Sequence, residues 1–260
     1  MSDWNIERAV DVLLAREADR ADGGRITDEW PDLDLATAYQ VQDALVGRKQ
    51  ADGEQVVGVK LGLTSRAKQQ RMGIDSPLTA WLTDAMVLPA DVPVPMGELI
   101  HPRIEPEIVF VMGERLAGPG VTAATAMQAV RSVHAGFEVI DSRYTDFKFR
   151  LPDVVADNAS SSRFIVSPTA LDPRGLDLAL EACLLSVDGE VVDSATGAAV
   201  QGHPAEALAL AANSLAERGI AIEPGWLVLT GGLTDAVFVE PGHQITAEFT
   251  HLGTVTVTGA

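Results

Sequence analysis

The chain has 260 residues, a single cysteine and a formal net charge of −18, with 37 acidic against 19 basic side chains. This length suits one large domain or one domain with a small appendage, and 47% hydrophobic residues with 22% charged ones predict a globular protein. The negative charge argues against a general nucleic-acid or anionic-membrane binder, because like charges repel. The lone Cys183 excludes an internal disulfide framework and a cysteine-rich zinc site.

The chain shows no signal for export or for insertion into a membrane. Its first residues are acidic, whereas a signal peptide needs a basic region followed by an apolar run. No stretch approaches the roughly 18 uncharged apolar residues of a membrane span. The sequence therefore predicts a cytoplasmic protein.

The first fifty residues predict two helices. Apolar residues recur at helical spacing over 4–20, and again from residue 34 or 35 to about 50. A turn-rich stretch at 23–32 separates them. We place a boundary near residue 52, between a helical N-terminal region (1–52) and a β-rich domain (53–260).

Beyond residue 52, short apolar or alternating runs bounded by Gly, Pro and Asp predict strands. These runs are 56–63, 104–112, 137–140, 164–166, 178–187, 226–229, 244–249 and 254–258. Asp188-Gly189 predicts a tight hairpin turn, because both residues accept positive φ. Helices are predicted at 66–72, 123–133 and 204–218. Since the strands outnumber the helices and do not alternate with them, we predict an α+β fold with a mostly antiparallel or mixed sheet.

A pair of acids lies in the segment 101–113. As a strand, this segment places Glu105 and Glu107 on one face, about 7 Å apart at the backbone. Such carboxylates repel each other unless a proton or cation intervenes, and an all-oxygen pair suits Mg²⁺ or Mn²⁺. The alternative is an edge strand with its acidic face in water, which Pro106 also favours.

Two further charges interrupt runs that otherwise resemble strands. Glu138 lies in a short apolar segment, and carboxylates are rarely buried unless they are paired or bind a metal. Together with Glu105 and Glu107 it would complete a set of ligands for one octahedral ion. Lys60 either points to solvent or, beside a metal, stabilises an enolate oxygen or moves a proton.

Other motifs point less clearly to a site. The histidines are scattered, Cys183 lies in an apolar segment that suggests packing, and phosphate-loop, dinucleotide-binding and nucleophile-elbow patterns are missing from the sequence. Two polar patches, 157–162 and 231–235, either line a site or form ordinary turns.

Taken together, these segments resemble the fumarylacetoacetate hydrolase superfamily, and within it the branch of 2-keto-4-pentenoate hydratases and 4-oxalocrotonate decarboxylases. The matching blocks, in family order, are VGVKLGLTS (57–65), MGIDSP (72–77), HPRIEPEIVFV (101–111), FEVIDSRYTDFKF (137–149), VVADNASSSRF (154–164), GHPAEALALAANSLA (202–216) and LTGGLTDAV (229–237), and the segment 38–42 fits as well. The resemblance implies a mixed β-sheet roll with a helical N-terminal region.

The resemblance also implies roles for individual residues. Glu105, Glu107 and Glu138 would hold Mg²⁺ or Mn²⁺, which in this family chelates the 2-oxo and 1-carboxylate groups of an α-keto acid. Lys60 would be the active-site lysine. Asp157 and Ser160 would contact the substrate or lie just behind the residues that do.

Position 78 bears on the choice between the two activities of this branch. The hydratases carry an acid there, which is suited to handling water, whereas the decarboxylases carry an apolar residue. This chain has Leu78 and so resembles the decarboxylases at this position. An apolar wall disfavours a charged carboxylate and favours neutral CO₂. The stretch 142–149 is also decarboxylase-like, whereas Thr79-Ala80 departs from both patterns, which usually have an aromatic residue followed by glycine.

The resemblance therefore implies decarboxylation of 2-oxohex-3-enedioate (4-oxalocrotonate) to 2-hydroxypenta-2,4-dienoate in meta-cleavage aromatic catabolism. The alternatives are hydration of 2-hydroxypenta-2,4-dienoate, C–C hydrolysis or oxaloacetate decarboxylation, and a non-catalytic partner subunit of a hydratase. The expected partners are a small-molecule 2-oxo dicarboxylate, further copies of the chain in a homo-oligomer, and a paralogous hydratase. Nucleic acid and membrane are not expected partners.

Overall fold

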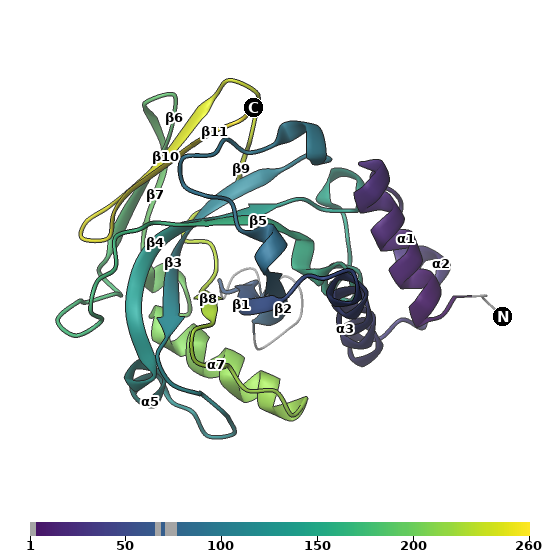
Figure 1. Ribbon diagram of the computed structural model, residues 1–260, viewed down its shortest axis with the longest axis horizontal. Coiled ribbons are helices and arrows are strands. Elements are labelled where there is room, and N and C mark those ends of the chain that lie inside the picture. The colour runs from purple at the N-terminus through teal and green to yellow at the C-terminus, as the bar shows by residue number, and fades with distance from the viewer. Residues whose placement is uncertain (1–3, 66–68, 71–76) are drawn as a thin grey trace.

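The computed structural model describes residues 4–65, 69–70 and 77–260. Within these ranges the chain forms two β-sheets and a group of N-terminal helices beside them (Figure 1). This arrangement confirms the predicted α+β class. The predicted helix 66–72 and the block 72–77 lie mostly outside the described residues.

The larger sheet carries the site. Its strands are β1 (Val56–Gly62), β2 (Leu78–Thr83), β3 (Arg103–Met112), β4 (Val130–Ile140), β5 (Ser161–Val166), β8 (Leu227–Leu229) and β9 (Val237–Phe238). Their order is β2-β1-β8-β3-β4-β5, and β9 pairs with β3. The β1–β8 pair is parallel and the other pairs are antiparallel, so the sheet is mixed, as predicted.

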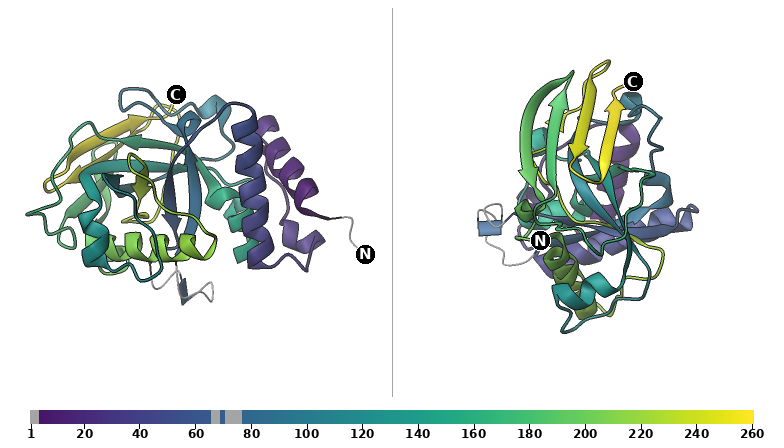
Figure 2. Two further views of the ribbon diagram at one scale, coloured as in Figure 1. Left: turned by 60° about the horizontal axis from the view of Figure 1, so that its bottom comes forward. Right: turned by 90° about the vertical axis from the view of Figure 1, so that its left-hand side faces the viewer.

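The smaller sheet is antiparallel, in the order β11-β10-β6-β7. Its strands are β6 (Ala182–Val187), β7 (Glu190–Thr196), β10 (Gln244–Phe249) and β11 (Gly253–Thr258). They lie side by side in the right-hand view of Figure 2. The hairpin predicted between β6 and β7 is confirmed, with φ values of 51° at Asp188 and 82° at Gly189.

The helices are α1 (Ile6–Asp19), α2 (Ile26–Glu29), α3 (Leu35–Ala51), α5 (Ala123–Gln128), α6 (Leu151–Ala156) and α7 (Pro204–Glu217). Short 3₁₀ turns are η1 (Asp84–Met86), η2 (Met96–Glu98), η3 (Thr145–Phe147), η4 (Asn158–Ser160) and η5 (Gly197–Ala199). The helices α1 and α3 begin at side-chain caps from Asn5 and Asp34, near the predicted starts.

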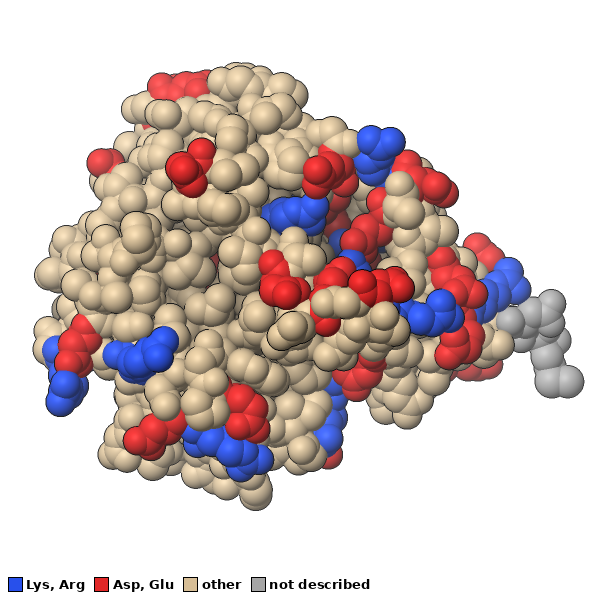
Figure 3. Space-filling view, in the orientation of Figure 1, with Lys and Arg blue, Asp and Glu red and all other residues tan. Residues whose placement is uncertain are grey.

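The N-terminal helices share a hydrophobic core with part of the β-rich chain. Leu13 of α1 and Val41 of α3 belong to the same buried cluster as Leu78, Tyr144 and Val155. The division at residue 52 stays a prediction. Acidic side chains are frequent over these helices and sparser over the sheets in the view of Figure 3.

The predicted helix 123–133 is wrong in its second half, because α5 ends at Gln128 and β4 begins at Val130. Val133 pairs with Phe110 of β3, and β-branched residues pack well in such cross-strand pairs.

The edge-strand interpretation of the acidic segment is also wrong, because β3 lies between β8 and β4. The Pro106 carbonyl accepts a hydrogen bond from Leu233 N. The nitrogen and the carbonyl of a strand residue point toward the same neighbouring strand, so the Pro106 nitrogen also faces the side of Leu233. On that side of β3, β8 pairs with residues after Pro106 and β9 pairs with residues before it, so neither strand lies opposite Pro106. Proline therefore removes no ladder hydrogen bond here.

None of the helices in the described ranges is long and apolar enough to span a membrane.

Candidate metal centre and active site

Three carboxylates meet on one face of the β3–β4 ladder. Glu105 of β3 lies directly opposite Glu138 of β4, and Glu107 is the next residue on the same face of β3. One oxygen from each side chain lies within 4.8 Å of the others. Glu107 and Glu138 are buried and Glu105 is half-buried. The structure thus brings together the three acids that the sequence predicted.

Burial and mutual repulsion disfavour three ionised carboxylates at this position. Glu107 Oε2 accepts a hydrogen bond from Gly231 N at 2.7 Å, whereas its buried Oε1 has no hydrogen-bond partner among the described residues. Burial first, and then the charges of Glu138 and Glu105, raise the pKa of Glu107 well above 4.5. A proton or a cation is therefore needed to balance the cluster.

A divalent ion fits these residues. The donor set is all oxygen, which is the set preferred by hard ions such as Mg²⁺ and Mn²⁺, and the buried Glu107 Oε1 is an unused acceptor. Glycine at 232 lets the neighbouring loop close over the cluster, because a Cβ there would lie 2.2 Å from Glu105 Oε2. Glu105, Glu107 and Glu138 would hold the ion.

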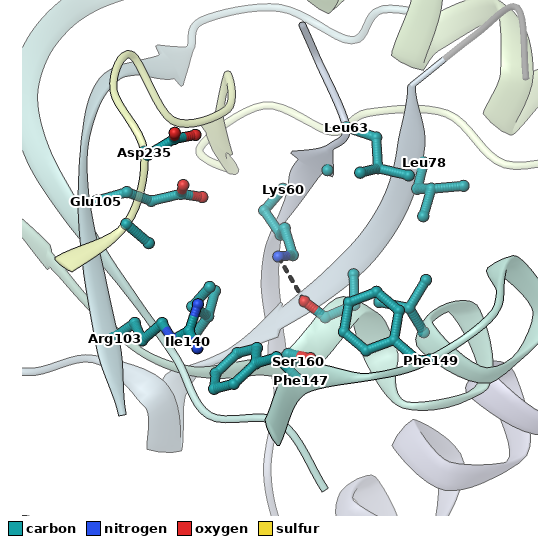
Figure 4. A pocket seen from close by; sticks show the side chains of 14 residues that line it. Lys60, Leu63, Leu78, Arg103, Glu105, Ile140, Phe147, Phe149, Ser160 and Asp235 are labelled. Carbon is teal, nitrogen blue, oxygen red and sulfur yellow. Dashed lines mark hydrogen bonds between the residues drawn. The ribbon is translucent and has the colours of Figure 1, made fainter. Parts of the chain in front are cut away.

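Lys60 reaches this cluster from β1. Its Nζ donates a hydrogen bond to Glu138 Oε2 at 3.1 Å. It donates a second one to the Ala159 carbonyl at 2.8 Å (Figure 4). Glu138 Oε1 lies 2.9 Å from the same ammonium, but outside hydrogen-bond geometry. With its side chain 3% exposed, Lys60 does not point to solvent, so the alternative interpretation of this lysine is wrong.

The Ala159 carbonyl is directed at Lys60 by an unusual turn. Asn158, Ala159 and Ser160 have φ values of 47°, 49° and 59°, a left-handed region that costs non-glycine residues about 1 kcal/mol or more each. The Asn158 side chain accepts a hydrogen bond from Trp81 N at 2.8 Å and donates one to Trp81 O at 2.9 Å. These two bonds tie the turn to β2.

Asp157 supports the same turn from behind. It is fully buried and ion-paired with Arg143, and its Oδ2 accepts a hydrogen bond from Ser160 Oγ at 3.2 Å. Burial raises the pKa of Asp157 to about 6, although Arg143 acts in the opposite direction. Ser160 lines a cavity that opens beside the three carboxylates, whereas Asp157 does not. Of the two positions expected for Asp157, it therefore takes the one behind the cavity wall, where it bonds to Ser160.

A cavity of about 580 Å³ opens beside the three carboxylates. It is lined by Lys60, Gly62, Leu63, Leu78, Arg103, Glu105, Ile140, Phe147, Phe149, Val154, Ala159, Ser160, Asp235 and Ala236. In Figure 4, Glu105 and Asp235 lie on one side of Lys60, and Leu63, Leu78 and Phe149 on the other. Leu78 is thus part of an apolar wall, at the position where the sequence suggested one.

Sequence reasoning assigned no role to several lining residues, among them Arg103 and Phe147. The available signal was that Arg103 precedes Glu105 by two residues, which places both on one face of β3. Of the two polar patches, 157–162 contributes Ala159 and Ser160 to the wall, and 231–235 contributes Asp235. The second patch also contributes Gly231 N, which donates to Glu107.

Known proteins resemble this chain over most of its length. Residues 55–258 match the family described as fumarylacetoacetate (FAA) hydrolase C-terminal. A 4-oxalocrotonate decarboxylase from Pseudomonas sp. (strain CF600) is 45% identical over 92% of this chain and 90% of that protein. A 2-hydroxyhexa-2,4-dienoate hydratase from Comamonas testosteroni is 37% identical over 89% of each chain.

Solved structures agree with this relationship. The 4-oxalocrotonate decarboxylase from Pseudomonas putida G7, complexed with magnesium and adipate, superposes with a TM-score of 0.95 at 40% identity, over 100% of both chains. The fumarylpyruvate hydrolase from Pseudomonas aeruginosa, with Mn²⁺ and pyruvate, has a TM-score of 0.60 at 16% identity over 78% of this chain and 88% of that one, a likeness of fold alone. The chain belongs to the fumarylacetoacetate hydrolase family.

Proposed function

We propose that this chain is a metal-dependent carboxy-lyase that converts 2-oxohex-3-enedioate to 2-hydroxypenta-2,4-dienoate and CO₂. The observation that carries the proposal is the pairing of three clustered glutamates and a buried Lys60 with an apolar wall at Leu78. The 4-oxalocrotonate decarboxylases among its relatives support it.

The reaction breaks the bond between C5 and the carboxylate carbon C6. The electron pair moves through the conjugated chain to the 2-oxo oxygen, which then takes a proton, and C6 leaves as CO₂. A divalent ion held by the three glutamates would supply positive charge to the oxygen that accumulates the electron pair. Lys60, a donor to Glu138 and to Ala159, would stabilise the same dienolate or deliver the proton.

The wall that contains Leu78 assists the departure of CO₂. A carboxylate against Leu63, Leu78 and Phe149 loses hydration in its charged form, whereas neutral CO₂ does not. Among the described residues, Leu63, Leu78 and Phe149 of this wall carry no base that could activate a water molecule. Decarboxylation is therefore favoured there over hydration.

A divalent ion is supported by the solved relatives, and we propose Mg²⁺ or Mn²⁺ as the one used by this chain. One related decarboxylase structure contains magnesium and another contains calcium, while the fumarylpyruvate hydrolase contains Mn²⁺. Adipate in the magnesium complex is a six-carbon dicarboxylate, the same length as the proposed substrate.

Hydration of 2-hydroxypenta-2,4-dienoate is the second candidate, because hydratases are also among the relatives. Replacing Leu78 with Asp tests why one activity is favoured. Leu78→Asp should lose decarboxylation and gain the addition of water. Leu78→Asn is the control, because asparagine has nearly the size of aspartate but cannot act as a base. It should lose decarboxylation without gaining hydration. Equal hydration by the wild type and Leu78→Asp would contradict this role of the wall.

Partners beyond the substrate are also proposals. We expect a cytoplasmic homo-oligomer that associates with a paralogous hydratase, which would consume the dienol product. A non-catalytic partner subunit would not require Lys60 and three glutamates to be arranged as one cluster.

The proposed activity is tested with purified protein and 2-oxohex-3-enedioate. CO₂ should be released with Mg²⁺ or Mn²⁺, stop on addition of EDTA and resume when the ion is restored. Undiminished turnover in EDTA would contradict the proposal.

A further inference from the structure

Arg103 is a cationic residue that lines the cavity but takes no part in the proposed reaction steps. It lies two residues before Glu105 on β3, so the two side chains share a face with their Cα atoms about 7 Å apart. Both line the cavity, together with Phe147. Figure 4 shows Arg103 beside Phe147 and Ile140, away from Leu63 and Leu78.

The guanidinium contacts two aromatic rings. Its Cζ lies 4.2 Å from the ring centre of Phe147 and 4.4 Å from that of Phe238. Rings over the guanidinium leave its N–H edge for hydrogen bonding, and this edge matches the two oxygens of a carboxylate. The buried Nε has no hydrogen-bond partner among the described residues, and none of their carboxylates forms an ion pair with Arg103.

Arg103 also brings positive charge to the cavity from the same face of β3 as the metal-ligand candidate Glu105. A positive charge in this position attracts an anionic substrate.

We propose that Arg103 binds the carboxylate at the oxalyl end of a 2-oxo acid, the carboxylate that remains in the product. This inference rests on the proposed function. An arginine beside the departing carboxylate would stabilise its ionised form and oppose loss of CO₂. The apolar wall on the other side of Lys60 is the place for that group, so the substrate extends from Arg103, past the metal ligands, to Leu78.

Two unreactive 2-oxo acids separate the two ends of the substrate. 2-Oxohexanoate and 2-oxoadipate share the oxalyl end and the chain length, and only the latter has a far carboxylate. Their dissociation constants are measured by calorimetry with saturating Mg²⁺ for wild type, Arg103→Gln, Arg103→Lys and Arg174→Gln. Arg174 is a matched control, because it is exposed and pairs with Asp172, two residues away.

Arg103→Gln should weaken both ligands by the same factor, roughly 10- to 100-fold, since a charge-assisted hydrogen bond to the shared carboxylate is lost. Arg103→Lys should weaken both by a smaller common factor, and Arg174→Gln should change neither. A loss confined to 2-oxoadipate would place Arg103 at the far carboxylate and overturn the inference. Unchanged affinities would overturn it as well.

A Mg²⁺ titration of each variant checks that the metal site is intact. If Arg103→Gln loses Mg²⁺ binding, the two ligands are compared in Arg103→Lys, which keeps the charge and the aliphatic stem. Because neither ligand reacts, this result is independent of turnover. Failure of the proposed function would appear instead as a wild-type protein that releases no CO₂ from 2-oxohex-3-enedioate.

Discussion

Glu105 and Glu138 face each other directly across the antiparallel register of β3 and β4, each from a different strand of the same ladder. One step along, Glu107 faces Gly136, where a Cβ would lie 2.6 Å from Val109 Cγ2 and 2.7 Å from the Ile165 carbonyl oxygen. The register therefore fixes two of the acids opposite each other. Opposite the third it places a glycine, because Val109 and the Ile165 carbonyl already occupy the position that a Cβ would take.

Glu107→Gln should abolish tight binding of the divalent ion. The substitution removes a charged oxygen ligand at a fully buried position, and we expect Mg²⁺ affinity to fall more than about 100-fold and turnover to be lost. The metal-free variant should unfold at the same or a higher temperature than wild type, because repulsion in the cluster is reduced. Glu114→Gln, the same change at an exposed position beyond β3, is the control. A variant that binds Mg²⁺ normally would contradict this assignment.

The metal-free protein should lose stability as the pH rises. The folded state raises the pKa of Glu107 well above 4.5, so its contribution to stability is complete below that pH and is lost as the pH rises through the folded pKa. Thermal unfolding in EDTA between about pH 5 and 8 measures the slope of stability against pH. Glu107→Gln should flatten it, and saturating Mg²⁺ should cancel it in wild type. A slope identical in wild type and Glu107→Gln would assign the effect to other groups.

Lys60→Met should separate catalysis from metal binding. We expect kcat to fall at least about 100-fold, because the substitution removes the group that we propose stabilises the dienolate or moves the proton. Mg²⁺ affinity should be equal or higher, since the ammonium that contacts Glu138 no longer repels the ion. Lys49→Met, which removes a lysine that pairs with Glu17 between α3 and α1, serves as the control. Parallel losses of kcat and Mg²⁺ affinity would indicate that Lys60 only maintains the cluster.

Asn158→Ala should release the turn that directs the Ala159 carbonyl at Lys60. Losing two hydrogen bonds to Trp81, and placing alanine at positive φ, should lower the free energy of unfolding by about 1–3 kcal/mol and also lower kcat. Asn213→Ala is the matched control, because Asn213 makes the same pair of bonds to Val121 N and O, both at 2.9 Å. If both variants lower kcat equally, the turn has no specific role in catalysis.

The site was predictable from the sequence where a charge interrupts an apolar pattern. Glu107, Glu138 and Lys60 stood out for that reason, and each is buried in the structure. The N-caps and the hairpin at Asp188-Gly189 were predictable because they depend on adjacent residues.

Features that depend on distant contacts were not predictable from local patterns. The turn at 158–160 is held by Trp81 on β2 and by the buried pair of Asp157 and Arg143, and its residues have no intrinsic preference for three successive positive φ values. Arg103 is the first residue of β3 and resembles an ordinary solvent-facing charge in the sequence, but β9 and η3 bring Phe238 and Phe147 against its guanidinium.

The central claim is tested most directly by following the carbon of the departing carboxylate. With 2-oxohex-3-enedioate labelled with ¹³C at C6 and saturating Mg²⁺, NMR should show one equivalent of labelled CO₂ or bicarbonate for each substrate consumed, together with unlabelled 2-hydroxypenta-2,4-dienoate or its keto form. Retention of the label in a hydrated product, or consumption of 2-hydroxypenta-2,4-dienoate with none of the labelled substrate converted, would contradict the account.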